Sequence, residues 1–336
     1  MKKTIILSLI VIVVGSFVAC NKNKRFEVPG SVPKIEMKVI RFDKDFLKLD
    51  TNKIDAGIKE LYRRYPDFMS IYTGDILGVD PHDTAQVSDL VLGFLSDTVF
   101  KSVNEKALAV FADESPFEQQ LSAAFTKLHY YFPEIKIPEI YFFVSGFNRS
   151  LLFDNEMIGV GTDMFLGVDY PRYQSFTYQY LINNMHPESI TPSVMKGWLY
   201  NNFPYVPAEE RLLENMLYRG KIMFLLSVLM PDETPDLLMG YEKNQWEWSR
   251  KYEKQIWETI IDRNDLFTSD LMLIKKYIDE APFTATVSQE SPGKLGVWLG
   301  WQIVQSYMDK HPEVTLRALM LDNNYKHIFD KSGYQP

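Results

Sequence analysis

The chain has 336 residues, 46% of them hydrophobic and 14% aromatic, which supplies a large core and excludes a disordered protein. Its formal net charge of −8 makes it a poor partner for nucleic acid or for an anionic membrane surface, so we set both classes aside. The single cysteine excludes a disulfide framework within the chain.

The N-terminus has the parts of an export signal. Met1–Lys3 is cationic, Ile5–Val14 is apolar apart from one serine, and Ala19 stands directly before Cys20. This order predicts a lipoprotein signal peptide over residues 1–19, with Cys20 acylated as the mature N-terminus. Phe17 departs from the leucine usual at its position, and the alternatives are an uncleaved anchor or an ordinary signal with a coincidental cysteine. Several acyl chains on Cys20 would form a durable membrane anchor.

Residues 20–33 are predicted to be a tether that carries the folded part. The tether starts with a basic run, Asn21–Arg25, and ends in the segment Pro29–Pro33. An acidic run at this place resembles a surface-export signal in some outer-membrane lipoproteins, and its absence favours the periplasmic side. Residues 34–336 contain no repeat, low-complexity run or long linker, so they are predicted to form one globular domain.

The first half of this domain mixes helix and strand signals. Ser115-Pro116-Phe117-Glu118 predicts a capping box with proline at the first helical position, opening a helix that ends at Pro133. Around Asp154-Asn155-Glu156 two short apolar runs predict a hairpin. We expect strands at 35–42, 140–144, 150–153 and 157–160, and helices from Thr51 to Pro66, over 83–95 and over 115–132.

The second half is predicted to be helical almost to its end. Residues 209–230 form an amphipathic helix whose second part, Ile222–Met230, is apolar on every face, which is typical of a core helix. Nine such residues are too few for a bilayer, which needs roughly 20. We expect helices at 173–185, 192–202, 209–230, 244–262, 294–310 and 314–330. The fold class is therefore mainly α with a small β-sheet (α+β).

Sequence motifs for catalysis are missing. No two of the five histidines are four residues apart, which excludes an HExxH zinc helix, and neither a phosphate-binding P-loop nor a G-x-S-x-G elbow is present. With Cys20 assigned to lipidation, thiol catalysis and cysteine-based zinc sites are excluded too. We therefore expect no metal, no cofactor, no catalytic residue and no enzyme activity.

Four stretches together carry a resemblance to a known family. They are Ile158–Gly167, the segment from Gly220-Lys221 through Gly240-Tyr241 to Trp248, Glu253 and Trp257, the run Ser291–Met308, and the ending Lys331–Pro336. With the signal before Cys20, they resemble the gliding-motility-associated lipoprotein family GldB over the mature chain. The resemblance implies a lipid-anchored cell-envelope protein with envelope protein partners, an outer-membrane anchor facing the periplasm, and a non-catalytic accessory role in motility or secretion.

A second, fainter likeness is to the layout of gluzincin metallopeptidases, with a hairpin, a helix at 192–202 and a helix that carries an acidic residue before a glycine. Here Lys196 lies in the first helix and Arg219 precedes Gly220. Lys196, Arg219 and Lys221 would repel a metal cation. The likeness therefore implies a degenerate metallopeptidase-like scaffold with a remnant cleft.

The candidate site residues outside the lipidation site come from this cleft and from the family motifs: Asp163, Lys196, Arg219, Lys221 and Glu253. Lys221 is expected to pair with Glu253 or Asp163, and an anion pocket made by Arg219 and Lys221 is the alternative. Two rival functions stay open. One is a peptidase-like hydrolase with a site near Asp163, Lys196 and Glu214, and the other is a small-ligand carrier that uses the remnant cleft.

Overall fold

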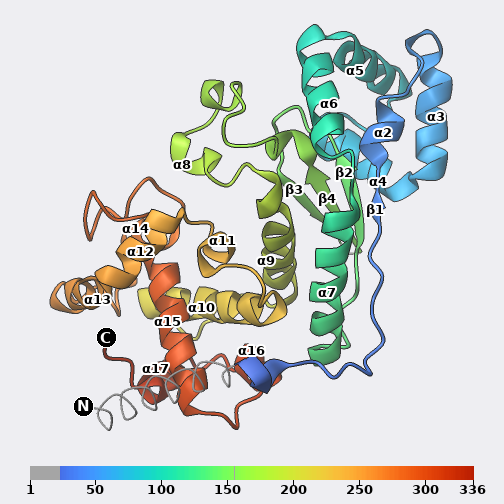
Figure 1. The fold of residues 1–336 in the computed structure, drawn as a ribbon. Helices are drawn as coiled ribbons and strands as arrows, with labels where there is room; N and C mark the ends of the chain where they lie inside the picture. Colours follow the sequence, from blue (N-terminus) through green and yellow to red (C-terminus); the bar gives the residue numbers. More distant parts are fainter. Residues whose placement is uncertain (1–22, 155) are drawn as a thin grey trace, which may run out of the picture. The chain divides into compact units, whose positions relative to one another are not determined.

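A computed structural model of the chain describes residues 23–154 and 156–336. The predicted signal peptide, Cys20 and Asn155 lie outside the described residues. The chain divides into two units, Met1–Lys34 and Ile35–Pro336. Within the first unit the described part contains one short 3-10 helix, η1 (Asn23–Phe26). All further elements belong to the second unit (Figure 1).

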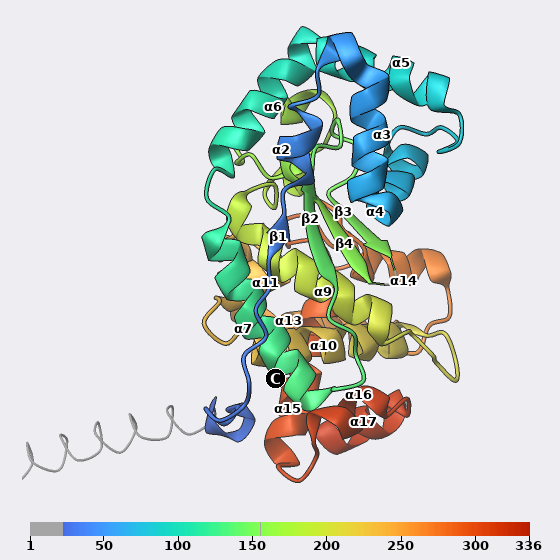
Figure 2. The same cartoon turned by 90° about the vertical axis from the view of Figure 1, so that its right-hand side faces the viewer.

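The second unit contains a small four-stranded sheet in the order β1-β2-β4-β3 (Figure 2). Its strands are β1 (Val39–Ile40), β2 (Glu139–Phe143), β3 (Leu151–Asp154) and β4 (Met157–Gly161). β2 pairs in parallel with both β1 and β4, whereas β3 pairs antiparallel with β4, which confirms the predicted hairpin. All residues of β2 after Glu139 are buried, so the sheet lies inside the domain.

Helices make up most of the remaining structure, which confirms the predicted fold class, mainly α with a small sheet. The α-helices are α2 (Phe42–Phe46), α3 (Ile54–Arg64), α4 (Pro66–Ile71), α5 (Thr84–Ser96), α6 (Thr98–Val110), α7 (Ser115–Tyr131), α8 (Gln179–Ile182), α9 (Ile190–Asn202), α10 (Leu212–Leu229), α11 (Pro235–Met239), α12 (Lys243–Lys251), α13 (Glu253–Asp262), α14 (Leu271–Ile278), α15 (Leu295–Lys310), α16 (Leu316–Leu321) and α17 (Tyr325–Ser332). Short 3-10 or π turns are η2 (Thr51–Lys53), η3 (Tyr72–Ile76), η4 (Thr162–Met164), η5 (Tyr173–Ser175) and η6 (Pro187–Ser189).

Aromatic side chains fill the core between the sheet and the helices α2 to α5. Phe68 of α4 stacks on Tyr141 of β2 with ring centroids 4.2 Å apart, and Phe42 lies edge-on to Phe68 at 4.9 Å. All three rings belong to one buried cluster. Such ring pairs contribute roughly 0.5–1.5 kcal/mol each beyond the area they bury. This cluster attaches the N-terminal helices to the sheet.

The centre of the C-terminal half is the crossing of α10 and α15. A Cβ atom added to Gly300 would lie 1.9 Å from the carbonyl oxygen of Met216, and one added to Gly220 would lie 2.3 Å from the carbonyl oxygen of Gly300. The two helix backbones therefore touch, as glycine alone permits. α10 is buried along nearly its whole length, which confirms it as a core helix. α9 contacts both the sheet and α10 and so joins the two halves (Figure 1).

Several predicted boundaries of strands and helices are wrong, because side-chain hydrogen bonds end these elements at other residues than the hydrophobic pattern predicts. The predicted strand at 35–42 shrinks to β1, since the N–H groups of Ile35 and Met37 donate to Thr126 and Ser122 of α7. The predicted capping box does not form, because the Glu118 carboxylate accepts the N–H of Val39 instead, at 3.1 Å.

The long helices predicted at 173–185, 244–262 and 314–330 are each broken into shorter pieces. Asn324 interrupts the last by capping α17, where its side chain accepts the N–H of His327. α6 and α14 were not predicted, although Asp97 and Asp270 cap their first turns. No helix among the residues that the structure describes is both long enough and apolar enough to cross a membrane.

Candidate functional site

Arg219 and Lys221 of α10 face two different cavities. Successive residues of an α-helix are about 100° apart, so side chains two positions apart point away from each other. Gly220 lies between them and packs on Gly300 of α15. Arg219 lines one cavity and Lys221 another. The alternative of an anion pocket made by Arg219 and Lys221 together is therefore wrong.

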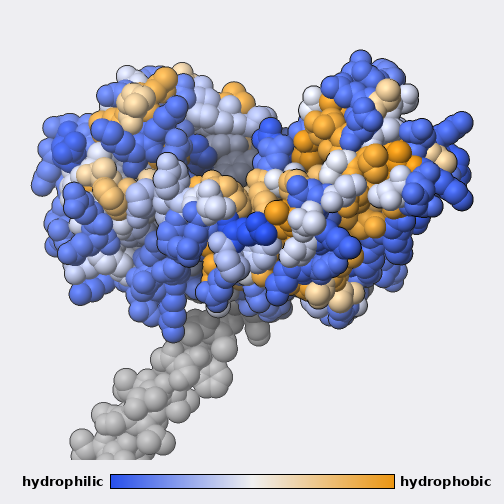
Figure 3. Space-filling model, turned by 90° about the horizontal axis from the view of Figure 1, so that it is seen from above, coloured by the Kyte–Doolittle hydropathy of each residue, from blue (hydrophilic) through white to orange (hydrophobic). Residues whose placement is uncertain are grey.

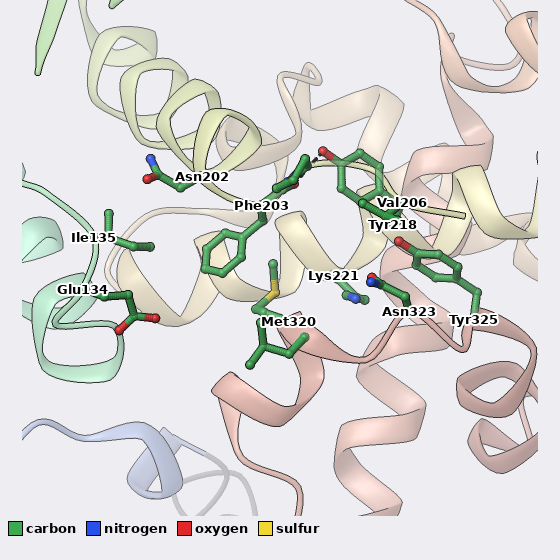
Figure 4. A pocket seen from close by; sticks show the side chains of 12 residues that line it. Glu134, Ile135, Asn202, Phe203, Val206, Tyr218, Lys221, Met320, Asn323 and Tyr325 are labelled. Atoms are coloured by element: carbon green, nitrogen blue, oxygen red, sulfur yellow. Dashed lines mark hydrogen bonds between the residues drawn. The ribbon is translucent and has the colours of Figure 1, made fainter. Parts of the chain in front are cut away.

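The Lys221 cavity has a volume of about 330 Å³ and lies between the α9–α10 connection and the segment around α16 (Figure 4). Only 1% of Lys221 is exposed, and its Nζ donates to the carbonyl oxygen of Asp322 at 2.7 Å. The ammonium also lies 5.0 Å from the ring centroid of Tyr325. Burial lowers the pKa of Lys221 to about 8, and the charge of Asp322 opposes this shift. The expected pairing of Lys221 with Glu253 or Asp163 is wrong, since its partner is a backbone carbonyl.

The Arg219 cavity has a volume of about 270 Å³ and brings together two of the predicted residues, Lys196 and Arg219. It also contains side chains that the sequence analysis missed, namely Tyr200, Glu280 and Lys294. Lys196 and Tyr200 come from α9, Glu280 follows α14, and Lys294 precedes α15. The spacing of Lys196 and Tyr200, four residues apart on one helix, was the available signal.

This cavity, which we call the Lys196–Arg219 cavity, is lined by three cationic side chains, Lys196, Arg219 and Lys294, and by two carboxylates, Asp279 and Glu280. Burial lowers the pKa of Lys196 to about 8, the charge of Lys294 acts in the same direction, and Glu280 opposes both. Burial raises the pKa of Tyr200, while the charge of Arg219 and a hydrogen bond between the two side chains oppose the shift. Lys294 forms an ion pair with Glu280. The Nε atom of Arg219 is buried and has no hydrogen-bond partner among the described residues.

Asp163 lies elsewhere, at the ends of β2 and β4. It is fully buried and accepts hydrogen bonds from the N–H of Ser145 at 2.8 Å, the Ser145 hydroxyl at 3.0 Å and the N–H of Phe147 at 2.6 Å. Burial raises the pKa of this carboxyl, and these hydrogen bonds oppose the shift. The Asp163 carboxylate thus connects the loop after β2 with the segment after β4, so its role in the fold is structural.

Glu253 holds the C-terminal segment. Its carboxylate accepts a hydrogen bond from the Tyr334 hydroxyl at 2.6 Å, and the Tyr334 ring lies edge-on to Trp257 with centroids 5.5 Å apart. Burial, and then the hydrogen bond to Glu253, raise the pKa of Tyr334. Lys310 of α15 donates to the carbonyl of Gly333 at 2.8 Å. The motif Lys331–Pro336 thus closes the fold and does not line either cavity.

The residues of the hydrolase hypothesis, Asp163, Lys196 and Glu214, occupy three different environments. Glu214 is only 8% exposed, and burial raises its pKa. Neither Asp163 nor Glu214 lines the cavity that contains Lys196. Within residues 23–154 and 156–336, no group of three or more His, Cys, Asp or Glu side chains is placed to hold a metal ion.

Comparison with known proteins gives one match. The model of a family described as gliding motility protein GldB matches residues 23–336, which is nearly the entire chain. No curated protein matches the chain, and no solved structure matches it either.

Proposed function

We infer the function from one premise, that the chain belongs to the gliding motility protein GldB family. We propose that it is a lipid-anchored component of the cell envelope, attached through acylated Cys20 to the outer membrane and facing the periplasm. In this role it serves the motility or secretion machinery by binding other envelope components. The cationic start, the apolar run and the alanine before Cys20 support the anchor.

One observation carries the non-catalytic part of this proposal, the positive charge of the Lys196–Arg219 cavity. In a metallopeptidase the equivalent space would have to attract a divalent cation, and two neighbouring cationic side chains repel one. The fully buried carboxylate of Asp163, which belongs to a family motif, already accepts three hydrogen bonds. This arrangement favours binding of a ligand over hydrolysis.

The surface over α5 and α6 supports a partner-binding role. Leu90 of α5 is 40% exposed and Val99 of α6 is 39% exposed. Figure 3 shows hydrophobic residues gathered on this part of the molecule, at the right of the view. Exposed apolar side chains that gather on one face are typical of protein interaction sites. We assign this surface to contacts with envelope proteins.

The anchor is tested in gliding cells that lack this chain. The full chain should restore spreading and sediment with membranes, whereas Cys20→Ala should leave the membrane fraction and fail to restore spreading. Asn23→Ala, which changes the tether but not the acylated residue, is the matched control and should behave as the unchanged chain. A Cys20→Ala protein that stays in the membrane fraction and supports spreading would overturn the lipid anchor.

The partner surface is tested by Leu90→Asp, with Leu321→Asp as the control because Leu321 is also exposed, at 62%, but lies in α16. Leu90→Asp should reduce spreading without lowering the melting temperature, and Leu321→Asp should leave spreading unchanged.

Catalysis is tested on the purified protein. Stoichiometric zinc together with peptide cleavage would refute the binding role and favour the hydrolase.

A further inference from the structure

The Lys196–Arg219 cavity is lined by two cations whose charges are only partly balanced, Lys196 and Arg219. Neither forms an ion pair with a residue of the described chain, and the buried Nε of Arg219 donates to nothing there, although its guanidinium shares a hydrogen bond with the Tyr200 side chain. The carboxylates that line the cavity, Asp279 and Glu280, are exposed, and Glu280 is already paired with Lys294. A buried donor without an acceptor costs about 1–3 kcal/mol, so an anion entering the cavity would satisfy it.

Apolar side chains also contribute to the lining of this cavity. Met223 of α10, Met239 of α11, Ile278 of α14 and Val297 of α15 line the cavity. A free inorganic anion would leave these walls without a partner, whereas an anion with an apolar body would cover them. The planar guanidinium of arginine matches the two oxygens of a carboxylate. A volume of about 270 Å³ lies just below the usual range of ligand sites, which limits the apolar body to a few carbon atoms.

The loop before α15 is built to hold Lys294 at the cavity. Lys294 has φ of +48°, a left-handed backbone conformation that is unfavourable for a side chain other than glycine. Thr284 fixes the loop, since its hydroxyl donates to the carbonyl of Pro292 at 2.8 Å, and Tyr241 donates to the carbonyl of Gly293 at 2.6 Å. Strain of this kind persists where the surroundings impose it, which occurs most at functional sites.

Helix α15 adds to the positive potential. Its first residue is Leu295, directly after Lys294, so its N-terminal turn lies at the cavity wall that Val297 lines. The dipole of a helix N-terminus favours an anion nearby, although the N–H of Leu295 itself donates to the Thr284 hydroxyl. Lys196, Arg219 and the start of α15 thus converge on one small space.

We propose that the Lys196–Arg219 cavity binds the carboxylate group of a small apolar anion, supplied either by a free carboxylic acid or by the C-terminal residue of a protein chain. This inference deepens the proposed function, because it names a ligand class for a protein that acts by binding. The carboxylate accepts hydrogen bonds from the Arg219 guanidinium and the Lys196 ammonium, while its carbon chain lies against Met223 and Val297.

The test is calorimetric titration of the full chain, purified in a non-ionic detergent. The probes are 4-methylpentanoate, its neutral analogue 4-methylpentanamide, inorganic phosphate, and an acetylated tripeptide that ends in leucine, as the free acid and as the amide. At least one of the two carboxylate probes should bind, and both amides should fail. Binding of the tripeptide alone would identify a chain terminus as the source, and binding of 4-methylpentanoate would identify a free acid.

Variants locate the site. Lys196→Met and Arg219→Met each remove a charged donor and should weaken carboxylate binding about 10- to 100-fold, as expected for hydrogen bonds to charged groups. Lys221→Met is the matched control, because it removes a buried cation from the same helix but from the other cavity, and it should leave the affinity unchanged. A thermal melt of each variant verifies that it is folded.

Affinity should also fall as the pH is raised from about 7 to about 9, because the Lys196 ammonium is lost around pH 8. Tyr200, Arg219, Asp279, Glu280 and Lys294 also face this space. Any one of four results would overturn the proposal. They are equal binding of acid and amide, preference for phosphate, no binding of either carboxylate at millimolar concentration, and an equal loss of carboxylate affinity in Lys221→Met. Since none of these readouts is motility, a failure here leaves the envelope role standing, and a failure of the spreading assay leaves this site standing.

Discussion

Alanine in place of Gly220 tests whether the close crossing of α10 and α15 stabilises the C-terminal half. The new Cβ would lie 2.3 Å from the carbonyl carbon and oxygen of Gly300 and 2.8 Å from the backbone nitrogen of Trp301. Non-bonded carbon contacts are comfortable at about 3.5–4.0 Å, so the two helices must separate by about 1 Å or more. All three of these atoms belong to the backbone, so no side-chain rotation can relieve the clash.

The cost follows from that separation. A gap of about 0.5–1 Å forfeits a quarter to a half of each dispersion contact, and overpacking a tight core costs typically about 1–3 kcal/mol or somewhat more. We therefore expect Gly220→Ala to lower the free energy of unfolding by about 3 kcal/mol. For about 300 residues the entropy of unfolding is about 0.6 kcal/mol/K, so the melting temperature should fall by about 5 °C. Calorimetry and urea titration of the purified protein measure both values.

Gly93 of α5 is the matched control. It is a helical, exposed glycine, and no heavy atom lies within 4 Å of a Cβ added there. Alanine at this position should stabilise the protein by about 0.5–1 kcal/mol and raise the melting temperature by about 1–2 °C, because it reduces the entropy of the unfolded chain. A melting temperature of Gly220→Ala equal to that of the unchanged chain would refute the close crossing.

Three further substitutions test the buried polar groups. The folded pKa of Lys221, about 8, is below its ordinary value of 10.5, so the unfolded chain binds more protons and this residue makes stability rise between about pH 8 and pH 10.5. Lys221→Met should remove that rise and stabilise the protein near pH 7 by up to about 3 kcal/mol, measured as the difference in urea midpoints; an unchanged pH dependence would contradict it. Asp163→Asn turns an amide donor toward the N–H groups of Ser145 and the following loop, and should lower the unfolding free energy by about 1–3 kcal/mol; stabilisation instead would mean that burial outweighs the hydrogen bonds. Tyr334→Phe removes the hydrogen bond to Glu253 while retaining the ring, and should speed hydrogen exchange in the C-terminal segment, an effect of about 1–2 kcal/mol that is absent elsewhere in the chain.

The parts of the fold that could be predicted are those with a continuous pattern. The apolar second half of α10 identifies a core helix, which the structure confirms. Short elements could not be predicted, because side chains far away in the sequence determine where they begin and end. β1 is short because Ser122 and Thr126 of α7 take the backbone donors that a longer strand would use.

The candidate site was only half predictable. Lys196 and Arg219 are recognisable as cations beside apolar residues of their helices, but nothing local connects them with Lys294. That connection depends on the loop fixed by Thr284 and Tyr241, whose hydrogen bonds span sequence separations of 8 and 52 residues. The division of Arg219 from Lys221, in contrast, follows from helix geometry alone, and grouping them was an avoidable error.

The two cations beside Gly220 differ in how their charge is satisfied, and this difference separates a structural residue from a binding residue. Because Gly220 packs against α15, the residues on either side of it point away from this helix contact and into cavities. In its cavity, Lys221 donates a hydrogen bond to the carbonyl of Asp322 and lies over the ring of Tyr325, so groups within the fold stabilise its charge. The buried Nε of Arg219 finds no acceptor among the described residues, although the guanidinium shares a hydrogen bond with the Tyr200 side chain, and the neighbouring Lys196 forms no ion pair there. An anion in this cavity would add an acceptor and a counter-charge for the two cations, whereas the Lys221 ammonium already has an acceptor within the fold.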